Sequence, residues 1–196
     1  MELILVRHAR PVRHDPVEGR ADPGLRADGR QQARRLARWL AAEPIGAIYT
    51  SPARRARETA QPLTDLVGIE PAIDDGLSEF DREARSYVPI EELAATDDRW
   101  LALARGELYD DVDPVAFRKR VVETVEDLID RHPGEVVVAV CHGGVINAYV
   151  GDLLGIPTPL WFAPGYTGIS RIAASRRGPR AIVSLNEMGH LRDGVG

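Results

Sequence analysis

Short apolar runs alternate with helix-forming segments along this chain, and that alternation restricts its fold more than any other feature. Leu3–Val6, Ile45–Tyr49 and Glu135–Cys141 are almost wholly apolar. They have the pattern of strands that are covered on both faces. Because strands that alternate with helices are joined by right-handed crossovers, they form a mainly parallel sheet with helices on both faces. The sequence therefore predicts an α/β fold of three layers, α/β/α, around a mainly parallel central sheet.

Helix signals lie between these apolar runs. Gln31–Ala42 carries apolar residues at helical spacing. Ser51-Pro52 joins an N-cap serine to a proline at the first helical position, which predicts a helix to about Val67. The remaining expected elements are a brief strand at Glu70–Asp74, helices at Ile90–Ala104, from Asp113-Pro114 to His132, and from His142 to about Leu154, strands at Ser170–Ala173 and Ala181–Leu185, and a turn at residues 177–179.

The length of the chain indicates one domain. A chain of 196 residues can bury one substantial core, and no linker divides it, so we expect a single domain over residues 1–196. Residues 75–113 show only a weak pattern. We expect them to form an insertion or lid over the active site at the sheet edge.

Charge and composition exclude several classes of protein. The net charge of -5 argues against nucleic-acid binding, which needs a clustered basic face. Cys141 is the only cysteine, so an intrachain disulfide and a multi-cysteine metal site are excluded. No apolar segment reaches membrane-spanning length, and the N-terminal run is too short for a signal peptide. We therefore expect a cytoplasmic protein without a membrane partner.

Polar side chains follow three of the predicted strands at the points where they end. Arg7-His8 follows the first strand, Thr50-Ser51 the second and His142 the third. Binding sites in open α/β sheets form outside the carboxyl ends of the strands. Arg55 lies in the first turns of the helix after Ser51, and the helix after His142 begins with free N–H groups. Two imidazoles, two guanidiniums and a helix N-terminus at one place predict a pocket for a dianion such as phosphate.

The motifs that carry these residues resemble those of a known family. VRHAR near the N-terminus, SPARRARETA in the middle and VCHGG late in the chain are similar to the motifs of the histidine phosphatase superfamily, which has the phosphoglycerate mutase-like fold. The ordered set is far more specific than any one motif. The matching residues are Arg7, His8, Ser51, Arg55, Ala56, Thr59, Ala60, His142 and Gly143.

The resemblance implies a metal-independent phosphatase that uses covalent catalysis. His8 would attack phosphorus and form a phosphohistidine. Arg7, Arg55 and His142, together with Gly143, would hold the phosphoryl oxygens. Leu77-Ser78-Glu79 matches a family pattern that supplies the proton donor, so the resemblance gives this role to Glu79. The substrate would be a small phosphorylated metabolite, and no metal or other cofactor is expected.

The sequence departs from the family pattern at several points. Ala9 replaces a glycine, which is tolerable if the residue keeps a negative φ. His14 falls where an asparagine often contacts phosphate, and it is either a phosphate ligand or a loop histidine. The segment FDREARSYVPIEEL replaces a common family segment after Glu79, which leaves the substrate open. Arg10 and Arg13 suggest room for a second anionic group.

Alternative functions remain at this point. A phosphoglycerate-type mutase would use the same site but return the phosphoryl group to a second hydroxyl. A non-catalytic phosphate-binding module and a metal-dependent hydrolase based on His8, His14 and His142 are the other two readings. The sequence does not decide the oligomeric state, although a homodimer is common in the family.

Overall fold

The computed structural model describes residues 1–14, 18–108, 112–175 and 178–192. In chain order the elements are β1 (Glu2–Arg7), α1 (Ala27–Leu40), β2 (Ile45–Thr50), α2 (Arg54–Val67), β3 (Ala72–Ile73), η1 (Asp75–Leu77), η2 (Ile90–Glu92), α3 (Asp98–Ala104), α4 (Pro114–Arg131), β4 (Val136–Cys141), α5 (Gly143–Leu154), β5 (Ile169–Ala173), β6 (Ala181–Glu187) and η3 (Gly189–Leu191), where η marks a single 3₁₀ turn.

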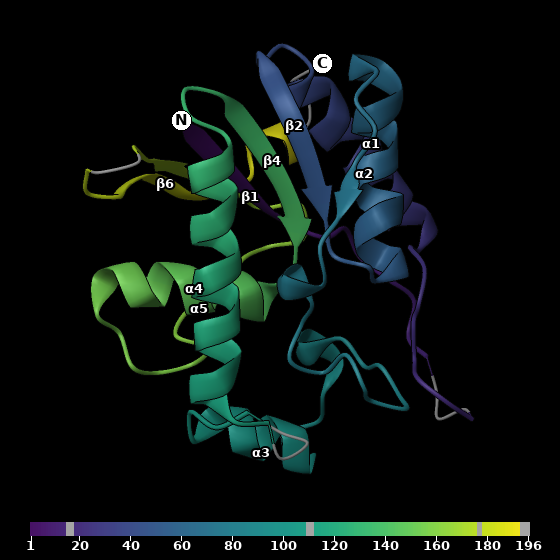
Figure 1. The fold of residues 1–196 in the computed structure, drawn as a ribbon. Helices are drawn as coiled ribbons and strands as arrows, with labels where there is room; N and C mark the ends of the chain where they lie inside the picture. The colour runs from purple at the N-terminus through teal and green to yellow at the C-terminus, as the bar shows by residue number, and fades with distance from the viewer. Residues whose placement is uncertain (15–17, 109–111, 176–177, 193–196) are drawn as a thin grey trace.

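The strands form one sheet in the order β3-β2-β4-β1-β5-β6. The first four strands run parallel, and β5 and β6 continue the sheet in antiparallel fashion. Figure 1 shows the arrows of β1, β2 and β4 pointing the same way. The expected α/β fold with a mainly parallel sheet is therefore confirmed.

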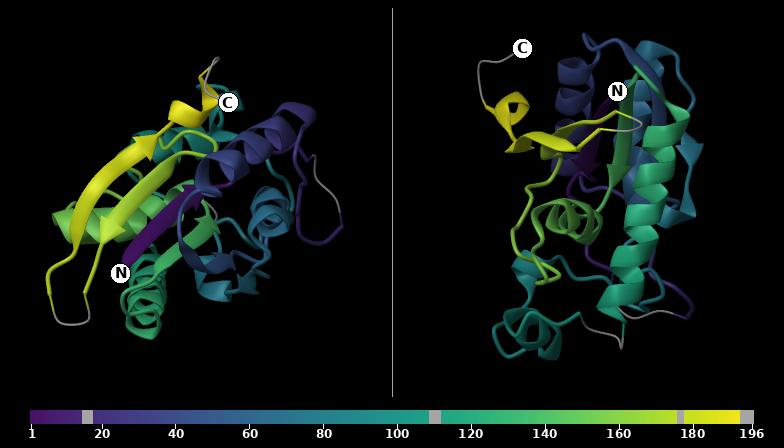
Figure 2. Two further views of the ribbon diagram at one scale, coloured as in Figure 1. Left: turned by 90° about the horizontal axis from the view of Figure 1, so that it is seen from above. Right: turned by 60° about the vertical axis from the view of Figure 1, so that its left-hand side comes forward.

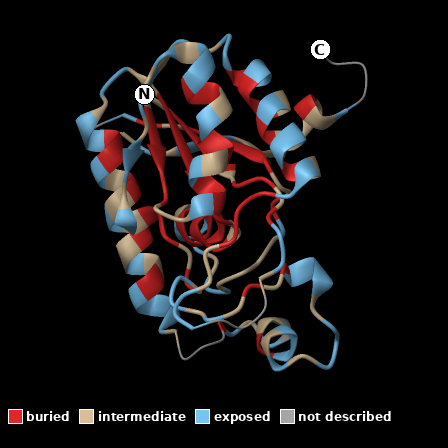
Figure 3. Ribbon diagram, turned by 90° about the vertical axis from the view of Figure 1, so that its right-hand side faces the viewer, coloured by how far each residue is buried: buried red, intermediate tan, exposed pale blue. Residues whose placement is uncertain are grey.

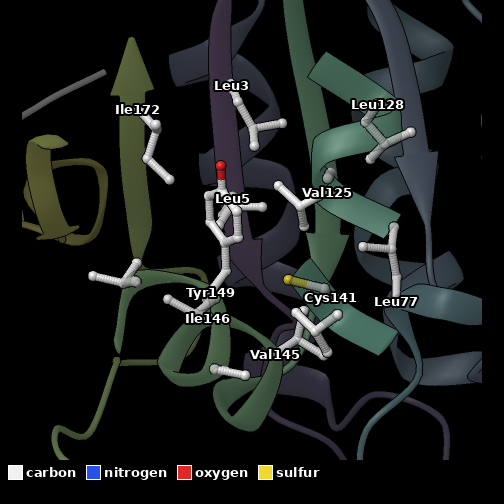
Figure 4. Close-up of a cluster of buried hydrophobic side chains, with 14 of the residues drawn as sticks. Leu3, Leu5, Leu77, Val125, Leu128, Cys141, Val145, Ile146, Tyr149 and Ile172 are labelled. Carbon is white, nitrogen blue, oxygen red and sulfur yellow. The ribbon is translucent and has the colours of Figure 1, made fainter. Parts of the chain in front are cut away.

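Helices cover both faces of the sheet. Successive side chains of β1 point to opposite faces, and on each face they are buried under helices. Leu3 and Leu5 pack with residues of α4 and α5, while Ile4 and Val6 pack with residues of α1 and α2. Figure 2 shows α1 and α2 on the side of the sheet opposite α4, and Figure 4 shows Leu5, Val125 and Tyr149 meeting in the layer beneath α4 and α5. Buried residues fill the strands and the inner faces of the helices (Figure 3).

The register of the sheet decides what meets at its carboxyl edge. Arg7 is opposite Cys141 in the β1–β4 pair, and Thr50 is opposite Val140 in the β2–β4 pair. Backbone bonds continue the ladder by one residue, from His8 N to Cys141 O at 2.9 Å and from Ser51 N to Val140 O at 3.0 Å. His8, Ser51 and His142 therefore leave the sheet side by side.

The start of α2 differs from the prediction. The helix begins at Arg54 with Ala53 at the N-cap, so Ser51 is not the cap and Pro52 is not its first residue. The hydroxyl of Ser51 is bound to His142 at 2.7 Å, and the carboxylate of Asp22 accepts from the N–H of Arg54 at 2.7 Å. The serine that local sequence rules assign to the N-cap of α2 instead makes a tertiary hydrogen bond.

The predicted helix at Ile90–Ala104 is confirmed only in its second part, since the chain forms the short turn η2, leaves the helical conformation at Leu93, and then forms α3. Leu93 is extended, which ends η2. The side chain of Asp97 then accepts from the N–H of Arg99 and starts α3. Asp113 caps α4 in the same way, as predicted.

The segment between β3 and α4 lies beyond the carboxyl ends of the parallel strands. Figure 1 and the right panel of Figure 2 show α3 below the sheet and apart from the other helices. Arg177, part of the predicted turn, lies outside the described residues. Among the described residues, no helix is both long and apolar enough to span a bilayer.

Candidate active site

Two imidazoles meet at the carboxyl edge of the sheet. The ring centroids of His8 and His142 lie 5.1 Å apart, and the rings are inclined at 62°. Both side chains are buried, with 2% of His8 and none of His142 exposed. The parallel register of β1 and β4 brings them together although 134 positions separate them in the sequence.

The hydrogen bond of His8 fixes which ring nitrogen is free. Its Nδ1 lies 2.9 Å from the backbone oxygen of Ala9. A carbonyl oxygen only accepts, so Nδ1 carries the proton and Nε2 keeps its lone pair. Burial, followed by the charges of Arg55 and Arg7, lowers the pKa of His8 well below 6.5. The imidazole is therefore neutral at pH 7, with a nucleophilic Nε2.

Ala9 holds this geometry in place. Its N–H donates to Thr59 Oγ1 at 2.9 Å, and its methyl group is buried with Leu25 and Ala33. Among the described non-glycine residues, only Thr167 and Asn186 have a positive φ. Ala9 thus meets the condition under which alanine can replace the usual glycine.

Arg7 and Arg55 place guanidinium groups beside His8. Arg7 donates to the backbone oxygen of Pro164 at 2.7 Å, and its Cζ lies 4.1 Å from the centre of the Tyr166 ring. Arg55 is 4% exposed; its Nη2 lies 3.5 Å from Asp81 Oδ1, and its Cζ lies 4.6 Å from the Tyr87 ring centre. The buried Nε atoms of both arginines have no protein partner. These donors suit an anion at His8.

His142 is oriented by Ser51. Its Nε2 lies 2.7 Å from Ser51 Oγ, which also accepts from the N–H of Ala53 at 3.3 Å. The buried Nδ1 of His142 has no protein partner. A serine proton donated to Nε2 leaves Nδ1 as the protonated nitrogen, a neutral donor for an anion. Burial, followed by the charge of Arg55, lowers the pKa of His142 well below 6.5.

Glu79 reaches this site from the loop after η1. Its Oε2 accepts from the N–H of Gly144 at 2.9 Å, and its Oε1 accepts from the N–H of Phe80 at 3.1 Å. Burial, with a smaller contribution from Asp81, raises the pKa of Glu79 to about 7. The two backbone bonds oppose that shift without cancelling it. Near neutral pH the carboxyl group can therefore both give and take a proton.

Gly144 is required where Glu79 meets α5. A Cβ atom at this position would overlap Glu79 Oε1 and would lie 3.0 Å from the Glu79 carboxyl carbon. At the neighbouring Gly143, the nearest atoms to an added Cβ are 3.8 Å away. Of these two glycines, only Gly144 lies so close to the Glu79 carboxyl group that a side chain would displace it.

These groups open into a cavity of about 520 Å³. Arg7, His8, Arg55, Glu79 and Gly143 all line it, and His142 lies against His8. His14 is not among the described residues that line the cavity; its backbone pairs with Tyr87. The structure thus brings together the predicted site residues with the exception of His14.

The cysteine and the two remaining histidines of the chain lie outside this cavity. Cys141 is fully buried in the core, where burial raises the pKa of its thiol. His132 bonds to Tyr49 and Glu135, and His190 bonds to Thr167. Among the described residues, no group of three or more His, Cys, Asp or Glu side chains is arranged to hold a metal ion.

Sequence reasoning missed Tyr87 and Tyr166, which face the two arginines. Each lies in a loop without helical or strand periodicity, so no local pattern marked it. An aromatic ring over a guanidinium holds the cation without using its N–H donors. The ring contacts therefore leave the buried Nε donors of both arginines without a protein partner.

Comparison with known proteins gives one consistent result. Residues 3–187 match the model of the histidine phosphatase superfamily (branch 1). The chain is 32% identical to a putative phosphoserine phosphatase 2 from Hydrogenobacter thermophilus, with 97% of each chain covered. It is 30% identical to a glucosyl-3-phosphoglycerate phosphatase from Mycolicibacterium vanbaalenii, covering 85% of this chain and 80% of that one.

Solved structures give the same picture. A phosphoserine phosphatase from Entamoeba histolytica, solved with phosphoserine bound, superposes with a TM-score of 0.77 at 26% identity, and 97% of this chain and 99% of that chain are covered. YhfR from Bacillus stearothermophilus superposes with a TM-score of 0.76 at 28% identity and the same coverage.

Proposed function

The chain is a phosphatase that belongs to the histidine phosphatase superfamily, branch 1, and we propose that it hydrolyses small phosphomonoesters through a phosphohistidine on His8. The observation that carries this proposal is the state of His8. Its proton is held on Nδ1 by Ala9, its Nε2 is free, and two arginines and a carboxyl group of raised pKa surround it.

The first half of the reaction transfers the phosphoryl group to the protein. His8 Nε2 attacks phosphorus, so that a P–N bond forms as the bond from phosphorus to the alcohol oxygen breaks. Arg7, Arg55 and His142 bind the other three oxygens and stabilise the charge that develops on them. Glu79 gives its proton to the leaving oxygen, which therefore departs as a neutral alcohol.

The second half regenerates the free protein. Glu79, now a carboxylate, removes a proton from a water molecule as that water attacks the phosphohistidine. The P–N bond breaks, inorganic phosphate forms, and His8 returns to its neutral state. A pKa of about 7 lets the same carboxyl group serve both halves. All steps use this chain's own residues, so we expect activity to persist in a chelator.

Trapping the intermediate tests this proposal. Protein mixed with a phosphomonoester and quenched in alkali should carry phosphate on His8, in a form that acid releases. His8→Ala should abolish both this label and steady-state release of inorganic phosphate. Turnover that survives His8→Ala would overturn the covalent mechanism, and failure to release phosphate from any ester would favour a non-catalytic phosphate-binding module.

A matched pair of arginine variants tests the oxyanion contacts. Arg55 is buried in the site, whereas Arg57 in the same helix is exposed. Arg55→Gln should lower kcat/KM by about 10²- to 10³-fold, the cost typical for losing one donor to a developing oxyanion. Arg57→Gln should leave kcat/KM unchanged. Equal effects of the two changes would contradict the assignment.

The same assay separates the mutase alternative. A mutase keeps the phosphoryl group and moves it between hydroxyls, so it would interconvert phosphoglycerates without releasing phosphate. We expect release in proportion to ester consumed. Interconversion without release would replace hydrolysis by phosphoryl transfer on the same His8.

A further inference from the structure

Besides the residues assigned to the phosphoryl group, the cavity is lined mostly by apolar and aromatic side chains. Its walls come from the segment that holds Tyr87 and α3, and from the loop after α5. Trp100 and Leu103 lie on α3, and Trp161 and Phe162 lie in that loop with ring centroids 4.5 Å apart. The full set of apolar lining residues is Phe80, Tyr87, Val88, Ile90, Trp100, Leu103, Leu160, Trp161, Phe162, Ala163 and Pro164.

Two of the polar side chains in these walls, Asn147 and Trp161, are already bonded within the chain. Asn147 donates to the backbone oxygens of Gly143 and Phe162, and its side-chain oxygen accepts from the N–H of Phe162. The indole N–H of Trp161 donates to the backbone oxygen of Asn147 at 3.2 Å. These residues present ring and methylene surface to the cavity, and they offer few donors to a polar leaving group.

Positive charge is confined to the phosphoryl end of the cavity. Of the described residues that line it, only Arg7 and Arg55 are lysine or arginine. Arg10, expected to serve a second anion, lies outside the lining and pairs with Glu92 at 3.1 Å and Asp28 at 3.5 Å. Arg13 is likewise absent from the lining.

The other charged groups of the walls are acidic. Glu91 lines the cavity with its Oε2 3.9 Å from Arg7 Nη2, and Asp81 pairs with Arg55. A carboxylate on the leaving group would meet these acids and apolar rings without a cation of its own. Burying an unpaired charge is costly, so such a substrate would bind weakly.

We propose that this phosphatase selects monoesters of uncharged alcohols with an aromatic or branched aliphatic body, and that it discriminates against leaving groups that carry a second anion. This inference rests on the proposed function, since it names the substrate class of the same site. The family relatives whose names refer to phosphoserine or phosphoglycerates act on compounds of the disfavoured kind. The walls of this cavity, rather than the chemistry at His8, set the difference.

A panel of alkyl esters tests the selection without the bias of activated leaving groups. The panel contains 2-phenylethyl phosphate, ethyl phosphate, phosphoserine and 3-phosphoglycerate. A hydrophobic pocket gains about 10- to 200-fold from one added methylene group. We therefore expect kcat/KM for 2-phenylethyl phosphate to exceed that for ethyl phosphate, and to exceed those for the two acidic esters by 10²-fold or more. A higher kcat/KM for phosphoserine or 3-phosphoglycerate would overturn the inference while leaving the phosphatase activity intact.

Two tryptophans of equal exposure give a matched control. Trp100 and Trp39 are each 39% exposed, but only Trp100 lines the cavity. Trp100→Ala should lower kcat/KM for 2-phenylethyl phosphate about tenfold and leave ethyl phosphate unchanged, whereas Trp39→Ala should change neither. Equal loss on both esters, or no loss from Trp100→Ala, would show that the α3 wall does not contact the alcohol.

Binding to the His8→Ala protein separates this inference from the proposed function. That variant lacks the nucleophile but keeps the walls, so calorimetry reads the preference of the cavity without turnover. Tighter binding of 2-phenylethyl phosphate than of phosphoserine supports the inference even if the catalytic proposal fails. The reverse order refutes it whatever the chemistry at His8.

Discussion

Replacing Gly144 by alanine should disable the proton donor while the fold stays intact. The added Cβ would lie 3.0 Å from the carboxyl carbon of Glu79 and 2.9 Å from a ring carbon of Phe80. Carbon atoms in contact prefer a separation of about 3.5–4.0 Å. The carboxyl group is the end of a flexible side chain and must retreat by about 0.5–1 Å, and the buried Phe80 ring must shift by a similar amount.

The size of the effect follows from that displacement. A misplacement of about 1 Å in a catalytic group costs on the order of 10²-fold in rate. The whole contribution of a general acid is typically 10²- to 10⁴-fold, so the loss lies within its range. Gly144 lies in the first turn of α5 with a negative φ, where alanine is at least as favourable as glycine. This gain offsets part of the cost of shifting the buried Phe80 ring, so we expect at most a small fall in melting temperature.

The assay compares two esters and two neighbouring glycines. Gly144→Ala should lower kcat/KM about 10²-fold for an alkyl phosphate, whose leaving group needs a proton. It should have a much smaller effect on p-nitrophenyl phosphate, whose leaving group departs as a stable anion. Gly143→Ala places its Cβ at an ordinary contact distance, 3.8 Å from Arg7 and Pro164. Because Gly143 is itself an expected phosphate contact, any loss from this change should be equal on the two esters, which distinguishes it from loss of the acid.

Three results would refute this reasoning. An unchanged kcat/KM for the alkyl ester would mean that Glu79 is not the acid, or that its position is unimportant. Equal losses on both esters would point to damage at the phosphate contacts. A large fall in melting temperature would show that the fold, and not the acid alone, had been disturbed.

The remaining predictions concern pH, orientation and stability. The value of kcat/KM should fall as pH rises through about 7, because Glu79 must be protonated to act. It should also fall on the acid side at a pH below 6.5, because His8 must be neutral. A continuous rise into alkali would contradict both assignments. The pKa of Glu79 is raised from 4.5 to about 7 in the folded protein, so its contribution to the free energy of unfolding is fully present below pH 4.5 and is lost as pH rises through about 7. Denaturant titrations across this range should show the loss in wild type and not in Glu79→Gln. Ser51→Ala should lower kcat with little change in melting temperature by freeing His142, and equal kcat would remove Ser51 from the site. Leu128→Ala should cost about 2–5 kcal/mol of unfolding free energy, since Leu128 is wholly buried; a cost below 1 kcal/mol would contradict the packing of α4.

The sheet and the phosphoryl end of the site could be predicted because their signals are local. The apolar run Leu3–Val6 ends in Arg7-His8, and the run before Cys141 ends in His142, so two strand ends were enough to bring the rings together. Ser51 shows the limit of such rules. Its sequence context favours an N-cap, but its hydroxyl binds a histidine that lies 91 positions away. Rules that consider only neighbouring residues do not include contacts between residues so far apart in the sequence.

The alcohol end of the site could not be predicted because its residues share no periodicity. Two separate loops and the seven-residue helix α3 supply Tyr87, Trp161 and Trp100. In the sequence, each of them is indistinguishable from an ordinary apolar residue. The sequence instead drew attention to Arg10 and Arg13, whose charge suggested a second anion site. Arg10 pairs with Glu92 and Asp28 outside the cavity, a pairing that only the fold reveals.

The two ends of the cavity differ in how firmly the fold holds them, and that difference bears on function. His8 and His142 extend from the strands β1 and β4, which are buried on both faces, and Glu79 is tied to the first turn of α5. By contrast, Trp100 and Leu103 belong to α3, in which Ala102 is the buried residue among those described. Substitutions in α3 therefore disturb little of the core. The phosphoryl chemistry should tolerate such changes while the choice of alcohol shifts, so that changes in this one wall can alter the substrate without rebuilding the catalytic end.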